Sequence, residues 1–377
     1  MNPYEEQKRL KITIVNCFDT YEDRVDMLCK ALRADGHTVF VVCSDWRHYQ
    51  KCVRTDSKEG FILVHAKPYQ KNISVTRILS HKAFAKAALQ AAANTNPDIL
   101  WVLVPPNYLI KEAALLKKKQ PSIKLVLDFN DLWPETMPIA KMKGSLPFRT
   151  WKSLREKYIN EADLIVTECG LFKDALTQET ENPQKLQILY PGRDLPEIKT
   201  DNKPPTDKVA LCYLGSINNI IDIDKIAEII QAFDTPVILH IIGGGEKKEV
   251  LVKAAENAGA TVVSHGNIYD PFEKQKIFDS CHFGLNVLKD SVFIGLTMKS
   301  IDYFAAGLPI VNTLHGDTEH FIEESKLGIN YKSFNDLGRF SLDCSQKHRQ
   351  QIRHFYEKYF SQSTFSSTLH YLIDLFK

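Results

Sequence analysis

The stretch that decides the fold is Leu296–Asn312, which reads LTMKSIDYFAAGLPIVN. Lys299 and Asp302 are three positions apart, so a helix would place both side chains on one face. Gly307 predicts the end of that helix, and Pro309 leads directly into a short apolar strand. A helix that ends in glycine and passes at once into a strand is typical of an α/β fold.

The first half of the chain repeats this alternation of strand and helix. In one helical pattern, Val25, Leu28 and Leu32 form an apolar face, which Gly36 ends. The expected strands are continuous apolar runs, as in a parallel sheet that helices cover on both faces. They lie at residues 11–16, 39–45, 61–66, 99–105, 124–129, 163–169 and 186–191.

A segment rich in proline and charge, 191–208, separates the two halves. After it the strand pattern restarts, at 209–215, 237–245, 261–266, 283–288 and 310–313. A chain of 377 residues is also too long for one core. We therefore expect an α/β protein with two tandem, Rossmann-like, doubly wound domains that face a cleft. The expected N-terminal domain is 1–195, with a final helix at about 355–377 packing back on it, and the C-terminal domain is 205–350.

Composition excludes several classes of protein. The net charge of +2 gives no reason to expect a nucleic-acid partner. The N-terminus lacks a secretory signal and no apolar run approaches the about 20 residues that span a bilayer, so a cytoplasmic location is expected. The dinucleotide fingerprint is missing after the first strand, and no P-loop sequence occurs. These absences weigh against nicotinamide dehydrogenases and P-loop NTPases.

Two glycine-containing turns in the second half are candidates for binding a phosphate. Gly215 and Ser216 directly follow an expected strand and precede a helix expected to begin near residues 221–224. Gly243 and Gly244 belong to the run IIGGGE after the next strand. Parallel sheets bind ligands beyond the carboxyl ends of their strands, with phosphates at helix N-termini. The alternative for both segments is an ordinary turn.

The spacing in the opening stretch fits a nucleoside diphosphate. If the helix begins near Thr297, its N-terminus and Lys299 can bind a phosphate. One turn later, the Asp302 carboxylate can accept hydrogen bonds from two vicinal hydroxyls, such as those of a ribose. The alternative is an ion pair between Lys299 and Asp302 at the surface, which contributes little.

At these residues the chain resembles glycosyltransferase family 4, whose members are retaining enzymes of the GT-B fold. MKSIDYFAAGLPIVN is similar to the family segment P-x-K-x-x-E-Y-x-A-x-G-x-P-[VI]. Five further segments resemble family motifs in the same order along the chain. These are the strand, helix and DLWPE stretch that ends at residue 135, then NEADLIVTEC, ILYPGRDL, LCYLGSINNIIDIDKIAEII and LHIIGGGEKKEVL.

The resemblance implies a donor nucleotide-sugar in the C-terminal domain and an acceptor in the N-terminal domain. Asp302 matches the carboxylate that binds the ribose, and Lys299 matches a lysine near the donor phosphates or sugar. Gly215 and Ser216 match the loop at the diphosphate. Asn130 and Asp131 match the position where many members carry a histidine beside the donor sugar.

The sequence departs from the family pattern at four places. Ile294 stands where the first glutamate of the acidic-x7-acidic motif is expected, and Asn130 stands where histidine is common. The Arg-x4-Lys pair after the Gly215 loop and the glycine pair after the first strand are missing. Arg193 and Lys299 are the cations left for the phosphates, and Arg193 offers a bidentate contact. The alternative for Arg193 is a surface arginine.

The resulting hypothesis is retaining transfer of a hexosyl or N-acetylhexosaminyl group from a UDP-sugar, of the type found in bacterial polysaccharide synthesis or adhesin glycosylation. No catalytic metal is expected, because the one candidate dyad, DID at 222–224, lies in a predicted helix. The leaving phosphate itself can deprotonate the acceptor, and Asp131 is the first choice if the protein supplies a base. A carboxylate that only caps a helix or satisfies its own loop is the alternative for Asp131. The rival functions are a non-catalytic partner subunit of another transferase and a GT-B epimerase.

The sequence leaves the acceptor open among saccharide, lipid-linked and protein-linked compounds. Two groups of lysines favour peripheral contact with an anionic membrane, at residues 117–119 and at Lys141 and Lys143. The alternative is that these side chains are only solvated. Homo-oligomerisation also stays open.

Overall fold

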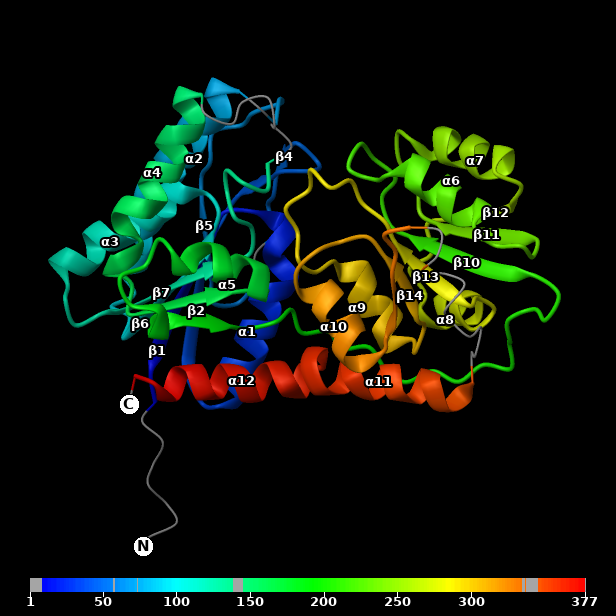
Figure 1. The fold of residues 1–377 in the computed structure, drawn as a ribbon. Coiled ribbons are helices and arrows are strands. Elements are labelled where there is room, and N and C mark those ends of the chain that lie inside the picture. Colours follow the sequence, from blue (N-terminus) through cyan, green and yellow to red (C-terminus); the bar gives the residue numbers. More distant parts are fainter. Residues whose placement is uncertain are drawn as a thin grey trace, which may run out of the picture. The chain divides into compact units, whose positions relative to one another are not determined.

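The computed structural model describes residues 9–56, 58–72, 74–137, 145–333, 336 and 345–376. Lys141 and Lys143, two of the lysines considered for membrane contact, lie outside these ranges. The chain divides into two compact units. Unit 1 consists of Met1–Gly192 and Phe365–Lys377, and unit 2 is Arg193–Thr364 (Figure 1).

The sheet of unit 1 has seven parallel strands in the order β5-β2-β1-β6-β7-β8-β9. Each strand overlaps one of the seven expected ranges, so this part of the prediction is confirmed. The strands are β1 (Lys11–Asn16), β2 (Thr38–Ser44), β5 (Phe61–Val64), β6 (Ile99–Val104), β7 (Lys124–Phe129), β8 (Leu164–Thr167) and β9 (Leu186–Ile188). The antiparallel pair β3 (Trp46–Arg47) and β4 (Cys52–Val53) was not predicted.

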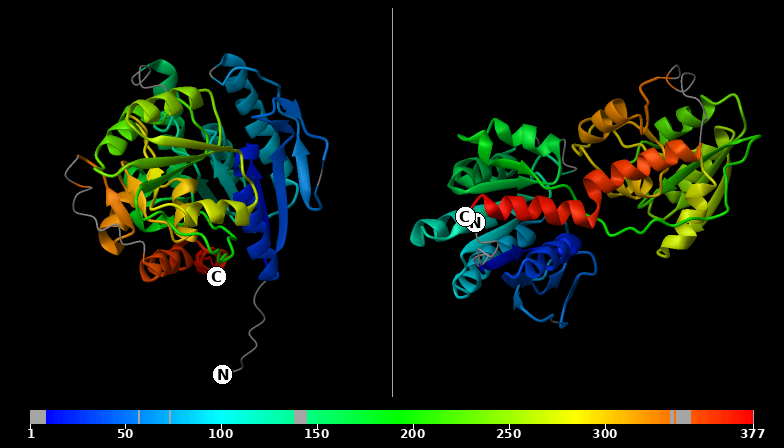
Figure 2. Two further views of the ribbon diagram at one scale, coloured as in Figure 1. Left: turned by 90° about the vertical axis from the view of Figure 1, so that its right-hand side faces the viewer. Right: turned by 90° about the horizontal axis from the view of Figure 1, so that it is seen from below.

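Helices cover both faces of this sheet. The helices α2, α3 and α4 pack side by side on one face, and α1 and α12 lie on the other (Figures 1 and 2). Leu28 of α1 and Leu369 of α12 belong to one buried cluster with Ile14 of β1. The helices are α1 (Glu22–Ala34), α2 (Val75–Ala93), α3 (Asn107–Lys119), α4 (Leu146–Tyr158), α5 (Gly170–Thr177) and α12 (Gln362–Asp374), with short 3-10 turns at Asp19–Tyr21, Ile159–Glu161 and Pro183–Lys185.

Unit 2 has a six-stranded parallel sheet in the order β12-β11-β10-β13-β14-β15. Its strands are β10 (Val209–Leu214), β11 (Val237–Ile242), β12 (Thr261–Gly266), β13 (Phe283–Asn286), β14 (Ile310–Asn312) and β15 (Gly328–Asn330). The first five were expected and β15 was not. The helices are α6 (Ile223–Gln231), α7 (Lys248–Asn257), α8 (Pro271–Asp279), α9 (Met298–Ala305), α10 (Asp317–Ser325) and α11 (Gln346–Phe360).

The expected final helix at 355–377 is divided at Ser361, so the tail forms α11 and α12 rather than one helix. Ser361 has an extended backbone, with φ −66° and ψ 157°. Its hydroxyl accepts a hydrogen bond from the Thr364 backbone N–H at 3.2 Å, as a helix N-cap does. Among the described residues, no helix is both long and apolar enough to cross a bilayer.

Each sheet has a point where the order of its strands reverses. In unit 1 this point lies at β1, which pairs with β2 on one side and β6 on the other. In unit 2 it lies at β10, between β11 and β13. Open α/β sheets bind ligands beyond the carboxyl ends of the strands at such points. The residues to inspect are therefore those that follow β1, β6, β10 and β13.

Candidate functional site

The N-terminus of α9 lies in unit 2 and is held from two sides. Thr297 is the N-cap of this helix, and its hydroxyl oxygen accepts from the Ser300 N–H at 3.2 Å. The same hydroxyl donates to Oδ1 of Asn286, the last residue of β13, at 2.9 Å. The predicted start of the helix near Thr297 is confirmed, and the helix is fixed to the end of the neighbouring strand.

Lys299 lies against the aromatic ring of Tyr213, from β10. Its Nζ is 4.5 Å from the ring centroid and 3.4 Å from the hydroxyl oxygen. The Tyr213 hydroxyl in turn donates to the carbonyl of Ser216 at 2.9 Å. Burial lowers the pKa of Lys299 from 10.5 to about 8. The structure thus brings Lys299 and the Gly215–Ser216 turn together at the reversal point of unit 2.

The glycines of this region allow two backbone segments to approach closely. Gly243 has a φ of +135°, and a Cβ added there would lie 2.1 Å from the carbonyl oxygen of Gly215. Gly215 itself has a φ of +113°. The N–H of Ile217 donates to the carbonyl of Gly244 at 2.9 Å. The glycines therefore have a packing role, and the predicted role of Gly215, Gly243 and Gly244 at a phosphate stays a prediction.

Asp302 is paired with Arg193 and not with Lys299. Arg193 donates to Asp302 Oδ1 at 3.0 Å, where the Arg193 side chain is 25% exposed and that of Asp302 13%. The alternative of a surface ion pair between Lys299 and Asp302 is therefore wrong, whereas Arg193 is a partly buried ion-pair partner. Burial raises the pKa of Asp302, while the nearby Arg193 opposes that effect. The two side chains expected at a ribose and a phosphate bind each other here.

The segment that carries Ile294 is fixed to α10. The carbonyl of Gly295, the next residue, accepts hydrogen bonds from Thr318, at 3.0 Å from the N–H and 2.8 Å from the hydroxyl. Ile294 itself offers no polar group to a ligand. In the acidic-x7-acidic pattern, unit 2 thus contributes one carboxylate, that of Asp302.

A row of asparagines at the strand ends was missed by the sequence analysis. Asn286, Asn312 and Asn330 end three adjacent strands in register. Asn286 donates to Asn312 Oδ1 at 2.8 Å, and Asn312 donates to Asn330 Oδ1 at 2.9 Å. The row ties these strands to the Thr297 cap. Its only sequence signal is that FGLN, IVN and GIN each end in asparagine.

In unit 1, Asn130 and Asp131 follow β7. The Asn130 side chain is buried and donates to the Asp128 carbonyl at 2.9 Å, so it serves the local turn. Asp131 accepts from the Trp133 indole N–H at 2.9 Å, and burial raises the pKa of its carboxyl. The alternatives for Asp131 were a helix cap and a carboxylate that is hydrogen-bonded within its own loop. No helix begins at Asp131, and the bond from Trp133 lies within the loop.

The end of the DLWPE stretch is anchored by a buried arginine of α4. Arg155 makes hydrogen bonds of 2.8 Å with both carboxylate oxygens of Glu135, and it also binds Glu179. Its guanidinium donates to the Trp133 carbonyl at 2.6 Å as well. The final glutamate of the stretch thus fixes the backbone that carries Trp133 and Asp131.

Metal-binding groups do not gather in the described ranges. No cluster there has three or more histidine, cysteine, aspartate or glutamate side chains placed to hold an ion. The DID segment differs from its prediction, because Asp222 lies before α6 as its N-cap and accepts from the Lys225 N–H at 2.9 Å. The expectation of catalysis without a metal stays a prediction.

Comparison with known proteins places these features in context. Residues 22–197 match the family model described as Glycosyltransferase Family 4. This match confirms the resemblance predicted from the sequence. No curated protein gave a significant match to the sequence.

Solved structures match both units. Sucrose-phosphate synthase from Thermosynechococcus elongatus is 13% identical with a TM-score of 0.72, covering 98% of this chain and 99% of that one. The lipopolysaccharide outer core galactosyltransferase WaaB is 14% identical with a TM-score of 0.69, covering 98% and 100%. Anabaena HepE in complex with UDP and glucose is 12% identical with a TM-score of 0.64, covering 97% and 100%. The chain therefore has the GT-B fold of glycosyltransferases, with two Rossmann-like domains.

Proposed function

We propose that this protein is a retaining glycosyltransferase that transfers a hexosyl or N-acetylhexosaminyl group from a UDP-sugar to a saccharide, lipid-linked or protein-linked acceptor. The observation that carries the proposal is the contact of Lys299 with Tyr213, whose hydroxyl binds the Ser216 carbonyl. It gathers a cation, a glycine turn and the N-terminus of α9 at the reversal point of unit 2. The UDP bound to HepE supports the choice of nucleotide.

The leaving UDP carries negative charge, which this site can stabilise without a metal. The backbone N–H groups at the start of α9 and the Lys299 ammonium supply positive potential where that charge develops. The Gly215–Ser216 turn can add the backbone N–H of Ser216, because the N–H of Gly215 already donates to the Ile242 carbonyl at 2.9 Å. Preorganised donors of this kind need little rearrangement during the reaction.

Donor binding has to rearrange the ion pair of Arg193 and Asp302. The ribose hydroxyls then donate to the Asp302 carboxylate, and the Arg193 guanidinium turns to the diphosphate, for which it has a suitable fork of donors. The exchange gives the guanidinium an anionic partner and leaves the carboxylate with hydrogen bonds from the hydroxyls. Transfer to the same face of the sugar lets the leaving phosphate accept the acceptor proton, and Asp131 is the candidate base in unit 1.

A thermal-shift panel of UDP, GDP, ADP and dTDP tests the donor site. UDP should raise the melting temperature by a larger amount than the other nucleotides, because ligand binding to the folded state stabilises it. Asp302→Ala should abolish the rise, since it removes the acceptor for the ribose hydroxyls. Glu256→Gln, at an exposed carboxylate on α7, is the matched control and should respond as the wild type does.

Activity is then separated from binding by measuring the release of UDP from UDP-sugars with and without acceptor. Turnover that persists in EDTA supports metal-independent transfer. Binding of UDP without turnover of any UDP-sugar would favour the non-catalytic partner subunit. A response to none of the four nucleotides would contradict the donor site itself.

A further inference from the structure

A cluster of aromatic and basic side chains lies at the strand-order reversal of unit 1. We call it the Tyr69 cluster, and it comprises Phe18, Tyr69, Arg77, His81 and Trp133. Phe18 is the second residue after β1, and its ring centroid is 5.2 Å from that of His81 and 5.7 Å from that of Trp133. Tyr69 packs on His81 at 5.8 Å. The cluster thus lies where an open α/β sheet binds ligands.

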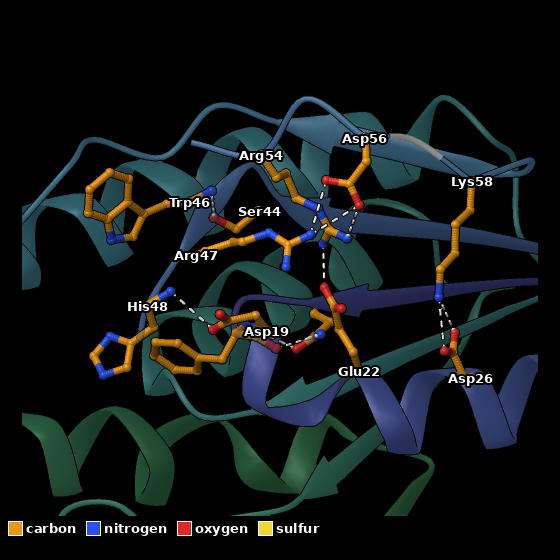
Figure 3. A network of polar contacts seen from close by, with 12 residues as sticks. Asp19, Glu22, Asp26, Ser44, Trp46, Arg47, His48, Arg54, Asp56 and Lys58 are labelled. Carbon is orange, nitrogen blue, oxygen red and sulfur yellow. Dashed lines mark hydrogen bonds and ion pairs between the residues drawn. The ribbon is translucent and has the colours of Figure 1, made fainter. Parts of the chain in front are cut away.

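Arg77 differs from the other buried arginines of the described part of unit 1. Arg24 pairs with Asp128 at 2.8 Å, and Arg155 pairs with Glu135 and Glu179. Arg54 pairs with Glu22 and also lies 3.6 Å from Asp56 (Figure 3). Arg77, only 8% exposed, has no carboxylate partner among the described residues.

Arg77 donates to the Asn72 carbonyl at 2.5 Å, forms a hydrogen bond with the Tyr69 side chain and lies against aromatic faces. Its guanidinium carbon lies 4.9 Å from the centroid of Trp133 and 5.6 Å from those of Phe18 and Tyr69. Cation–π contacts stabilise a buried guanidinium only in part. Burial raises the pKa of the Asp131 carboxyl and the charge of Arg77 opposes that rise, but no carboxylate of the described residues is close enough to form an ion pair with Arg77.

Two nitrogen atoms of the cluster are also without a hydrogen-bond partner in the described structure. They are Nε of Arg77 and Nε2 of His81, which is 5% exposed. The two residues are one turn apart on α2. Trp46, whose ring packs on Tyr69 at 5.8 Å, has a third such atom, its indole Nε1. Buried polar groups are nearly always hydrogen-bonded, so three orphans around one ring indicate a group that they bind.

We propose that the Tyr69 cluster is an oxyanion subsite, in which Arg77 and His81 bind a phosphate or carboxylate group. An oxyanion supplies an ion-pair partner for Arg77 and accepts from its unpartnered Nε–H. His81 is neutral, because burial holds its pKa well below 6.5, and its Nε2 donates when the ring carries the proton there.

A surface hollow of about 310 Å³ shares Tyr69 with this cluster. Its lining also includes Lys71 and Ser74, and Lys51 lies over the Tyr69 ring at 5.0 Å from the centroid. The hollow has the size of a monosaccharide and is bordered by positive charge. It lies beside the cluster, through Tyr69, and offers room for the neutral part of a bound molecule.

That the bound molecule is the acceptor rests on the proposed glycosyl transfer. The oxyanion subsite itself does not depend on that proposal. A lipid-linked acceptor brings a phosphate, and an acidic saccharide brings a carboxylate. Both present the same chemistry to Arg77. The subsite therefore narrows the acceptor to a compound that carries an oxyanion.

The test is thermal unfolding of the full chain with inorganic phosphate, methyl glucuronide or methyl glucoside at constant ionic strength. Phosphate, glucuronide or both should raise the melting temperature as their concentration grows, and the neutral glucoside should not. A response to phosphate alone indicates a phosphate-bearing group, and a response to glucuronide alone indicates an acidic sugar. Arg77→Met should lower the response strongly, and His81→Phe, which retains a ring, should lower it to a smaller extent.

Two control variants locate the effect. Lys82→Met, at an exposed position on α2, should respond as the wild type does. Lys299→Met, in the donor site of unit 2, should lose only the part of the phosphate response that Arg77→Met keeps. The inference is overturned if no oxyanion stabilises the wild type, if the glucoside acts equally, or if Lys299→Met loses the response while Arg77→Met keeps it. The rise in melting temperature that UDP causes in Arg77→Met is measured separately, because it tests the donor site of unit 2 and not the oxyanion subsite.

Discussion

Lys299 and Asp302 share a helix but have different partners. The sequence predicts that both lie on one face of a helix that begins near Thr297, and this much is correct. Their partners, Tyr213 and Arg193, are 86 and 109 residues away. Local spacing could not select these partners, because tertiary packing decides which of several distant groups fills the space beside a helix.

The pKa of Lys299 gives the donor site a pH dependence. Below its pKa of about 8 the amine is charged and attracts a diphosphate, and a bound diphosphate raises that pKa further. The affinity for UDP should therefore fall as the pH rises through about 8, where the free protein loses the charge that the complex retains.

Calorimetric titration with UDP from pH 6.5 to 9.5 measures this effect. Lys299→Met should bind UDP more weakly at the lower pH and show a flatter profile. Lys299→Arg should bind with little change over the range, because arginine stays charged. A wild-type affinity that is constant across this range would exclude contact between the Lys299 amine and the diphosphate.

At the scale of the elements, the glycines in the turns after β10 and β11 allow these two turns to pack closely. The sequence predicted glycines that permit positive φ and close ligand approach. The close approach that the structure shows is between the two turns themselves, with Gly243 against Gly215. A single-sequence analysis cannot tell a backbone neighbour from a ligand, because both demand the same absence of a side chain.

Gly243→Ala and Gly244→Ala form a matched pair that tests this packing. A Cβ at Gly243 would lie 2.1 Å from the Gly215 oxygen, whereas one at Gly244 would lie 3.9 Å from its nearest neighbour, Asn267 Oδ1. Gly243→Ala should lower the free energy of unfolding by about 1–3 kcal/mol or more. Gly244→Ala should change it by about 0.5 kcal/mol or less.

Urea denaturation measures both values, and UDP titration shows whether the displaced Gly215 turn loses affinity. Equal and small effects of the two substitutions would show that the turns do not depend on this contact.

The strands that the sequence missed are short, although β9 and β14, which were predicted, also have only three residues each. The segment Gly328–Asn330 has three residues, and Trp46–Arg47 and Cys52–Val53 have two each. Runs of this length carry no measurable period, and they become strands because longer neighbours or a turn provide partners. The asparagine row was missed for the same reason, since its meaning depends on the register of three strands.

For the whole molecule, the strand pattern sufficed to predict the class of fold. All seven strands of the parallel sheet of unit 1 and five of the six in the sheet of unit 2 correspond to apolar runs in the sequence. Buried parallel strands read as continuous apolar runs, which is a strong signal. The break at Ser361 was not predicted, because its cap depends on the local backbone and both flanking segments have helical patterns.

The Tyr69 cluster was beyond prediction for a different reason. Arg77 and His81 have helical spacing, but their aromatic neighbours come from segments far apart in the chain. That Arg77 has no carboxylate in an ion pair can be recognised only in the structure, where the other buried arginines of unit 1 have such partners. The chemistry of this site therefore becomes visible only once the packing of unit 1 is known.

The most direct test of the donor assignment is an experimental structure of the full chain with UDP. We expect the diphosphate at the start of α9 beside Lys299, and the ribose hydroxyls within about 3.2 Å of the Asp302 carboxylate oxygens. In that complex Arg193 is no longer the sole partner of the Asp302 carboxylate. A structure in which UDP binds elsewhere, or in which Asp302 stays with Arg193 and touches no ribose, would contradict the account.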